Sequence, residues 1–322
     1  MRSSVAAVAM ALLALSATAL AQVEGGFERT LKVSGPVDLQ VSTGSGSISV
    51  RSGAGDAVEV KARIRARDGG GYSAEEKVRR IEKEPPIEQS GNTISIGRTE
   101  EDDRDLYRNV SISYEIVTPA QTTLKSNTGS GSQTVIGIQG TVGANTGSGS
   151  ITMSEIGSEV HANTGSGSIK LDGVNGAVRA NTGSGSIHGA KLAGAIQANT
   201  GSGGVNLEQT AAGDVRVQTG SGSVAVAGVN GALFVRAGSG SINVAGQNTA
   251  DWDLHSGSGT IRIDLPENAA FNIDASTSSG SIDVDHPVTV QGRISKRWLK
   301  GSVRGGGPRV TVETGSGSIH VN

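Results

Sequence analysis

One six-residue phrase, Thr-Gly-Ser-Gly-Ser-Ile, recurs along most of the chain and restricts its fold more than any other feature. It is complete at 43–48, 146–151, 164–169, 182–187 and 314–319, and close variants begin at Thr128, Thr200, Thr219, Ala237 and Ser256. From Thr128 to Thr200 the step is 18 residues every time. A fixed period with constant turn residues is typical of a stacked repeat, in which each unit buries its apolar face only against its neighbours.

Apolar residues keep fixed positions relative to each Thr of the phrase. They occur four and two residues before it, as at Val142 and Ala144, and five and seven residues after it, as at Ile151 and Met153. Residues two apart lie on the same face of a strand. Each coil is therefore predicted to contribute two short inward-facing strands joined at the Gly-Ser-Gly bend, with one more apolar residue, such as Ile156, at the opposite corner.

These patterns predict an all-β fold, a single-chain parallel β-helix (β-solenoid) of ~18-residue coils, which we expect to be right-handed. Stacked coils lie ~4.8 Å apart, so about eleven of them would form a rod on the order of 50 Å long. The composition agrees with a thin core of small aliphatic side chains, because aromatic residues make up only 2% and glycines number 49 of 322.

The chain divides into four predicted segments. Residues 1–21 are predicted to be a signal peptide that ends in Ala19-Leu20-Ala21, which predicts an exported chain, periplasmic or secreted, with no integral membrane segment after cleavage. Residues 22–125 are predicted to form a β-rich N-terminal segment and cap, with one helix near 74–84 that the Pro85-Pro86 pair ends. Regular coils are expected over 126–263, and irregular final coils with a C-terminal cap over 264–322.

The repeated polar residues are expected to be structural. An Asn directly precedes the Thr in successive repeats, and identical amides stacked in parallel can hydrogen-bond along the column. The Thr and Ser hydroxyls are expected to do the same, and the bend is expected to need glycine because a sharp corner requires backbone angles closed to residues with a Cβ. The predicted turn and ladder residues are Asn145, Thr146, Gly147, Ser148, Gly149, Asn163, Thr164, Gly165, Ser166, Gly167, Asn181, Thr182, Gly183, Ser184 and Gly185.

No catalytic, cofactor-binding or metal-ligating set emerges from the sequence. The Gly-Ser-Gly-Ser phrase lacks the Gly-Lys-Ser/Thr of a phosphate-binding loop, and no Gly-x-Ser-x-Gly elbow is present. The five histidines do not share one coil position, so we expect no zinc site, and the absence of cysteine excludes disulfides. The net charge of −2 argues against nucleic-acid binding. The acidic run at 100–105 is expected to be a solvated turn.

Five parts of the chain point to one family: the opening FERTLKVSGPVDLQVSTGSGSI, the segments EPPIEQSGNTISIG and NVSISYEIVTP, the serial NTGSGSI coils and the closing RGGGPRVTVETGSGSI. Together they resemble the bacterial putative-adhesin β-solenoid family, catalogued as a domain of unknown function. The resemblance implies a parallel β-helix exported to the envelope and brings no catalytic residues. Members often carry Asp where this chain has Ser150, Ser168 and Ser186, so the resemblance implies no cation site here.

We therefore expect an exported, non-enzymatic β-solenoid that acts as an adhesin-like or structural interaction surface in the bacterial cell envelope. Its expected partner is a glycan or an envelope protein, with no nucleic acid, no cofactor and a monomeric state. One alternative is a β-helical polysaccharide lyase or hydrolase, which would need clustered carboxylates or a lysine or arginine base in a groove. The acids of the regular coils occupy non-equivalent positions. Another is an ice- or surface-ordering array, because Thr and Ser columns ~4.8 Å apart form a lattice. The basic segment 296–300 is expected to pack in the cap, with contact to anionic lipid or polysaccharide as the alternative.

Overall fold

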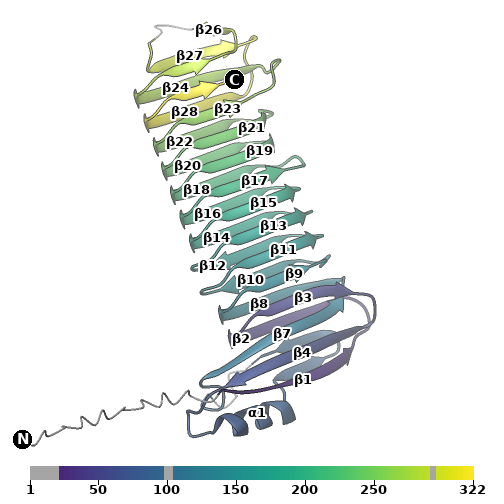
Figure 1. Ribbon diagram of the computed structural model, residues 1–322. Helices are drawn as coiled ribbons and strands as arrows, with labels where there is room; N and C mark the ends of the chain where they lie inside the picture. Colours follow the sequence, from purple (N-terminus) through teal and green to yellow (C-terminus); the bar gives the residue numbers. More distant parts are fainter. Residues whose placement is uncertain (1–21, 98–103, 291–294) are drawn as a thin grey trace, which may run out of the picture.

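The chain winds into a long rod of stacked coils, which Figure 1 shows with the N-terminal part at one end and the C-terminus near the other. The structure is a computed structural model, and it describes residues 22–97, 104–290 and 295–322. The predicted signal peptide, residues 1–21, and most of the acidic run at 100–105 lie outside the described residues. Within them, no helix is long and apolar enough to cross a membrane.

Each coil contributes one strand to each of two long sheets. In spatial order, sheet A consists of β1 (Val23–Lys32), β4 (Ala57–Ala66), β7 (Val110–Pro119), β3 (Ile48–Gly53), β9 (Gln133–Ile136), β11 (Ile151–Ile156), β13 (Ile169–Val174), β15 (Ile187–Leu192), β17 (Val205–Gln209), β19 (Val224–Asn230), β21 (Ile242–Gln247), β23 (Ile261–Asp264), β29 (Ile319–Val321) and β25 (Ile282–Val284).

The second sheet faces the first across the core. In spatial order, sheet B consists of β26 (Val288–Val290), β27 (Trp298–Val303), β24 (Phe271–Ser279), β28 (Arg309–Ser316), β22 (Trp252–Ser258), β20 (Leu233–Ser239), β18 (Val215–Ser221), β16 (Ile196–Ser202), β14 (Val178–Ser184), β12 (Val160–Thr164), β10 (Val142–Thr146), β8 (Thr122–Ser130), β2 (Val37–Ser45), β6 (Thr93–Ile96) and β5 (Ile87–Ser90).

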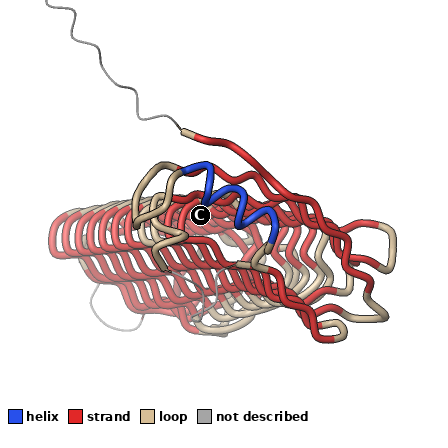
Figure 2. Tube along the Cα trace, turned by 90° about the horizontal axis from the view of Figure 1, so that it is seen from below, coloured by secondary structure: helices blue, strands red, loops and turns tan. Residues whose placement is uncertain are grey.

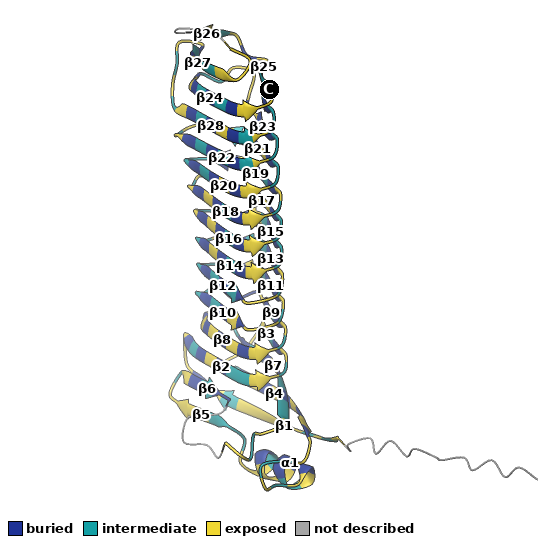
Figure 3. Cartoon of the chain, turned by 90° about the vertical axis from the view of Figure 1, so that its left-hand side faces the viewer, coloured by how far each residue is buried: buried dark blue, intermediate teal, exposed yellow. Residues whose placement is uncertain are grey.

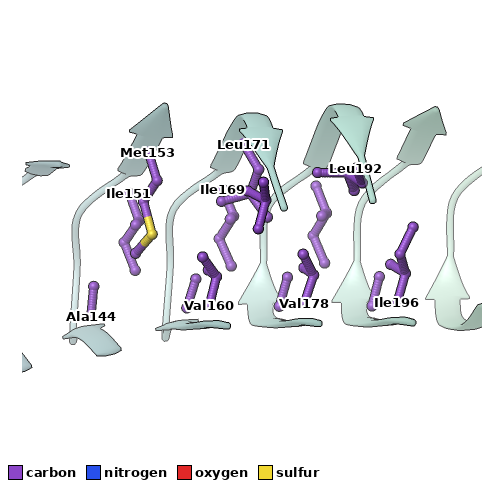
Figure 4. Close-up of a cluster of buried hydrophobic side chains, with 14 of the residues drawn as sticks. Ala144, Ile151, Met153, Val160, Ile169, Leu171, Val178, Leu192 and Ile196 are labelled. Carbon is purple, nitrogen blue, oxygen red and sulfur yellow. The ribbon is translucent and has the colours of Figure 1, made fainter. Parts of the chain in front are cut away.

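Equivalent residues of successive coils lie directly above one another. In sheet A, Ile151 pairs with Ile169 and Ile169 pairs with Ile187, and in sheet B Val160 pairs with Val178. All five are almost completely buried, and Figure 4 shows this cluster of side chains between the two sheets. The parallel β-solenoid predicted from the repeat is confirmed, with its aliphatic residues inside. Its right-handed winding stays a prediction.

The bend glycines are required for two reasons, of which only the backbone angle was expected from the sequence. In the central coils, Gly149, Gly167 and Gly185 do not adopt a positive φ. Instead, a Cβ placed on Gly167 would lie 2.0 Å from the carbonyl oxygen of Gly149 in the coil below, a distance that real Cβ atoms essentially never show. Glycine is needed in these coils because the stacked bends lie too close together for a side chain. In later coils, as at Gly240 with a φ of 145°, the backbone angle adds to this requirement.

A long insertion, residues 54–121 between β3 and β8, leaves the stack of coils uninterrupted. Strand β8 pairs with β2 in register, with Leu39 opposite Leu124 and Thr43 opposite Thr128. The inserted strands β4 and β7 and the antiparallel strand β1 extend sheet A, and the β5–β6 hairpin extends sheet B. The predicted helix is α1 (Ala74–Lys83), and Figure 2 shows it lying across this end of the rod.

A buried lysine fastens helix α1 to the end of the rod. The Nζ of Lys77 donates hydrogen bonds to the carbonyl oxygens of Arg67, at 3.1 Å, and Arg108, at 2.5 Å, and the side chain is fully buried. Burial lowers the pKa of Lys77 below its ordinary value, although the carboxylates of Asp68 and Asp105 oppose this shift. The lysine therefore holds the helix to two loops by satisfying carbonyl groups that no strand pairs.

At the C-terminal end the coils do not follow sequence order. Strand β28, in the last coil of the chain, pairs on one side with β22 and on the other with the earlier strand β24. The segment between β23 and β28 therefore passes over the stack, and the last coil is inserted beneath it. Strands β26 and β27 then run antiparallel on top, which ends the parallel stack.

Candidate functional site

A groove with a volume of about 1270 Å³ runs along one side of the rod. It crosses seven consecutive coils, from the one that contains Ser42, Thr43 and Gly44 to the one that contains Gln218 and Thr219. Figure 3 shows how the exposed ends of the sheet B strands, which lead into the bends, stack into one stripe along the rod. In each regular coil the lining residues are Asn, Thr and Gly, so we call this feature the Asn–Thr–Gly groove.

The asparagines of the groove form a continuous ladder. The Nδ2 of Asn145 donates to the Oδ1 of Asn127 at 3.0 Å, and the same bond joins Asn163 to Asn145 at 2.9 Å, Asn181 to Asn163 at 2.8 Å and Asn199 to Asn181 at 2.8 Å. An amide has two N–H donors and two acceptor lone pairs, so an interior member keeps one of each after making the ladder bonds. The groove therefore presents a row of equivalent donors and acceptors at the spacing of the coils.

The threonines behave differently from the expectation of a hydroxyl ladder. Each points inward, and its Oγ1 donates to the carbonyl oxygen of the second bend glycine in the coil below, at 3.0 Å for Thr146 to Gly131 and 2.7 Å for Thr164 to Gly149. The five threonines Thr146, Thr164, Thr182, Thr200 and Thr219 are each only 6% exposed. The Thr column therefore adds no hydroxyls to the surface lattice that the ice-ordering alternative needs, whereas the bend serines Ser148, Ser166 and Ser184 are exposed.

The Gly column gives the groove a smooth wall. A Cβ placed on Gly165 would lie 2.5 Å from the carbonyl oxygen of Gly147, so this column is also closed to larger residues. Without side chains, the backbone itself forms this part of the surface. At the N-terminal end the lining includes Tyr107 and Val110, and at the other end it includes Arg236.

The described lining of the groove lacks the carboxylates of a glycoside hydrolase. No Asp or Glu is among its lining residues in the described part of the chain, and between its two ends every lining side chain is uncharged. Within the described ranges, no group of three His, Cys, Asp or Glu residues could hold a metal ion. Such a surface can bind by hydrogen bonding and shape, whereas glycoside hydrolysis requires a pair of carboxylates.

The predicted turn and ladder residues are divided between the groove and its margin. The Asn, Thr and first Gly of each phrase line it, whereas Ser148, Gly149 and their equivalents are not among the lining residues. Sequence reasoning treated these residues as structural and missed the groove. One sequence signal could have indicated the groove: in each regular coil a Thr at a buried position lies between an Asn and a Gly that face outward. Trp252 lies in the core, where it is 1% exposed and its Nε1 donates to the carbonyl of Gly231 at 3.1 Å.

The coil stacking and the repeated bends agree with a family comparison over most of the chain. The family described as Toastrack DUF4097 matches residues 30–322. The chain belongs to this family. The resemblance inferred from the sequence is thereby confirmed, and the Toastrack domain is a β-solenoid of unknown function. No curated protein matches the chain.

Solved structures give distant likenesses of similar length. A putative cell adhesion protein from Clostridium sporogenes is 13% identical, with a TM-score of 0.22, and the match covers 92% of this chain and 99% of that one. A putative adhesin from Bacteroides fragilis is 11% identical, with a TM-score of 0.29 and coverages of 92% and 97%. A putative lipid binding protein from Parabacteroides distasonis is 15% identical, with a TM-score of 0.32 and coverages of 92% and 96%. Likenesses this distant say nothing about what this chain binds.

Proposed function

We propose that this protein is an exported, non-enzymatic, adhesin-like binding surface whose Asn–Thr–Gly groove holds an extended glycan chain. The observation that carries the proposal is the groove itself, which crosses seven coils with one repeated set of uncharged polar residues. A binding site of this length suits a linear polymer better than a compact small molecule, for which an enclosed pocket is the usual site. Export is proposed from the signal sequence, with a place in the periplasm or envelope or release from the cell.

A glycan fits the hydrogen-bonding groups that the groove leaves free. Sugar hydroxyls donate and accept, and each interior Asn of the ladder keeps one donor and one acceptor on an amide whose orientation the ladder fixes. A fixed amide loses little side-chain freedom when it binds, which lowers the entropic cost of association. An extended segment of an envelope protein is the competing occupant, and its backbone would use the same groups. The glycan is preferred because, between its two ends, the groove is lined by Asn, Gln, Thr and Gly and offers no apolar side chains to hold those of a peptide.

The first experiment measures binding and turnover together. The wild-type chain is applied to a glycan array, and every glycan that binds is incubated with the protein in a reducing-sugar release assay. The proposal expects binding without release. Release of reducing ends by the purified protein would establish an enzyme instead and contradict the proposal.

A pair of variants tests whether binding occurs in the groove. The double variant Asn145→Tyr, Asn163→Tyr fills the groove with two stacked rings, and stacks of identical aromatic side chains are compatible with parallel strands. The matched control is Thr152→Tyr, Lys170→Tyr, which places the same pair on the outer face of sheet A at paired positions. We expect the groove variant to lose at least about tenfold in affinity and the control to bind as wild type does. Equal binding by both variants would place the ligand elsewhere.

A further inference from the structure

From β8 to β20 the outer face of sheet B beside the groove carries charge of one sign, whereas β2, at the N-terminal end of the groove, carries Asp38. The seven strands β8, β10, β12, β14, β16, β18 and β20 contain no Asp or Glu, and every residue of these strands is described. Their charged or titratable residues are Lys125, His161, Arg179, Arg216 and Arg236. The chain as a whole has a net charge of −2, so positive charge is concentrated on this face.

The basic residues lie next to the Asn ladder on the same face. Lys125 and Arg179 each stand two residues before an Asn of the ladder, and residues two apart on a strand face the same side. Strand pairing stacks His161 on Arg179, as it stacks Asn163 on Asn181. Lys125, His161, Arg179 and Arg216 therefore form a basic column that runs beside the Asn ladder, and Arg236 stands in line with the ladder itself.

Two carboxylates lie beside three of these five basic residues. Glu159 lies 2.9 Å from the Nε2 of His161 and 3.8 Å from Arg179, and Asp253 lies 4.0 Å from Arg236. These contacts are exposed, so each ion pair is weak and a polyanion can compete with the carboxylate for the basic side chain. Among the described residues, no ion pair involves Lys125 or Arg216.

Two of the guanidinium groups lie against the same aromatic ring. The Cζ of Arg216 lies 4.1 Å from the ring centroid of Phe234, and the Cζ of Arg236 lies 4.9 Å from it. Two like charges held on one ring repel each other, so a bound anion would stabilise the arrangement. Guanidinium groups also bind carboxylate and phosphate oxygens through paired N–H donors. Because Arg236 lines the end of the groove, this pair marks a place where an anionic group of a bound polymer would lie.

The spacing of the charges suits a polymer that carries them repeatedly. Arg179 and Arg216 stand two coils apart in the stack, and Lys125 and Arg179 three coils apart. At ~4.8 Å per coil these separations are about 10 and 14 Å. A linear chain that follows the groove would therefore pass a cationic side chain at intervals, whereas a single small anion would use only one of them.

We propose that the ligand of the groove is a linear acidic polysaccharide. Its hydroxyl groups bind the Asn ladder, and its anionic groups lie against Arg179, Arg216 and Arg236. This inference rests on the proposed function and specifies the chemistry of the glycan. Single-stranded nucleic acid is the competing polyanion, but it binds by stacking its bases on aromatic side chains, and in the described groove the lining aromatic residues lie only at the N-terminal end.

The test compares one polymer in charged and uncharged form. Polygalacturonate oligomers, the same oligomers with methyl-esterified carboxyl groups, and oligo-dT are titrated into the full chain at low and physiological salt. The inference expects the charged oligomer to bind at least about tenfold more tightly than its ester, with affinity falling as salt rises, and oligo-dT to bind more weakly than polygalacturonate.

Two charge-matched variants locate the interaction. Arg179→Gln, Arg216→Gln, Arg236→Gln removes three charges beside the groove, and the control Arg51→Gln, Lys170→Gln, Arg262→Gln removes three from the outer face of sheet A. We expect the first variant to weaken polygalacturonate binding by about tenfold or more and the control by less than about twofold.

The outcomes separate this inference from the proposed function. Equal binding of the ester and the acid, with loss in the Asn145→Tyr, Asn163→Tyr variant, would refute the acidic ligand and leave the groove as a glycan site. Tighter binding of oligo-dT than of polygalacturonate would refute a glycan ligand. Equal losses in the two charge variants would refute the assigned face. A polygalacturonate affinity unchanged by filling the groove would contradict both the inference and the proposed function.

Discussion

Replacing Gly167 by Ala tests how closely the stacked bends approach one another, since the sequence predicted the stack but not this steric contact. A Cβ at this position would lie 2.0 Å from the carbonyl oxygen of Gly149, whereas real Cβ contacts shorter than 3.0 Å essentially do not occur. The coil below must therefore move by about 1 Å. Because the backbone at Gly167 does not adopt a positive φ, the cost comes from this displacement and not from the backbone angle.

The displacement acts on hydrogen bonds that join the same two coils. The carbonyl of Gly149 accepts from the Oγ1 of Thr164 at 2.7 Å, and the carbonyl of Gly147 accepts from the N–H of Ser166 at 3.1 Å. Lengthening each by about 1 Å removes it from hydrogen-bonding range. Two such bonds, together with the strain of overpacking, give an expected loss of about 2–4 kcal/mol in the free energy of unfolding.

Equilibrium urea unfolding followed by circular dichroism measures this loss, and hydrogen exchange of the flanking coils shows whether it is local. The control is Ser166→Ala, since Ser166 is exposed in the same bend and should change stability by less than about 0.5 kcal/mol. If Gly167→Ala were as stable as the control and its flanking amides equally protected, the bends could not be stacked as described.

Three further predictions concern the core, the C-terminal order and the helix. Ile169→Ala should lower the free energy of unfolding by about 2–5 kcal/mol and Ile169→Val by about 0.5–1.5, because the side chain is fully buried; similar values for both in urea unfolding would contradict the columnar core. Ser258 and Ser316 are strand partners, so cysteines introduced at these two positions should form a disulfide on oxidation. Cysteines at positions 258 and 279 should not, because Ser279 lies one coil further on. The reverse result on a non-reducing gel would contradict the inserted last coil. Because burial lowers the pKa of Lys77, the unfolded state binds more protons than the folded state between that lowered pKa and 10.5. The free energy of unfolding should therefore rise with pH over this window. This rise should be absent in Lys77→Met, and an equal rise in that variant would exclude the lysine as its cause.

Much of the fold could be predicted because each coil repeats the same physical solution. The period placed Ile151, Ile169 and Ile187 at equivalent positions, and apolar residues two apart fixed which face of each strand is buried. The single helix of the N-terminal segment was predicted from the residue pattern before Pro85, and the structure places it at Ala74–Lys83. Local periodicity is sufficient for these features because each coil packs only against its neighbours.

The C-terminal order could not be predicted from periodicity. The repeats at Ser279 and Ser316 have similar bends, and either could have been placed next to Ser258. Which one pairs there depends on how the segment between them folds back, and this is a long-range property. The sequence showed two similar coils and an irregular connection, but not their spatial order.

The groove was missed because its residues also have a structural role. Asn163 forms the expected ladder, and Thr164 forms a bond that the sequence did not indicate, to the backbone of the coil below. A ladder explains why the residues repeat, but it does not show whether the surface beside them is flat or hollow. That shape depends on the bend backbone and on the glycine column. The basic column was not predicted either, because the net charge of −2 is a sum over the whole chain and does not show where positive charge is concentrated.

The most direct test of the account measures distances along the stack by electron spin resonance. The chain has no cysteine, so spin labels can be attached to cysteines introduced at chosen exposed serines of the bends. Ser130 and Ser239 stand six coils apart and Ser130 and Ser316 eight, so the account predicts about 29 and 38 Å. A distance to Ser316 one coil longer would contradict the inserted last coil, and distances that did not increase with the number of coils would contradict the parallel stack itself.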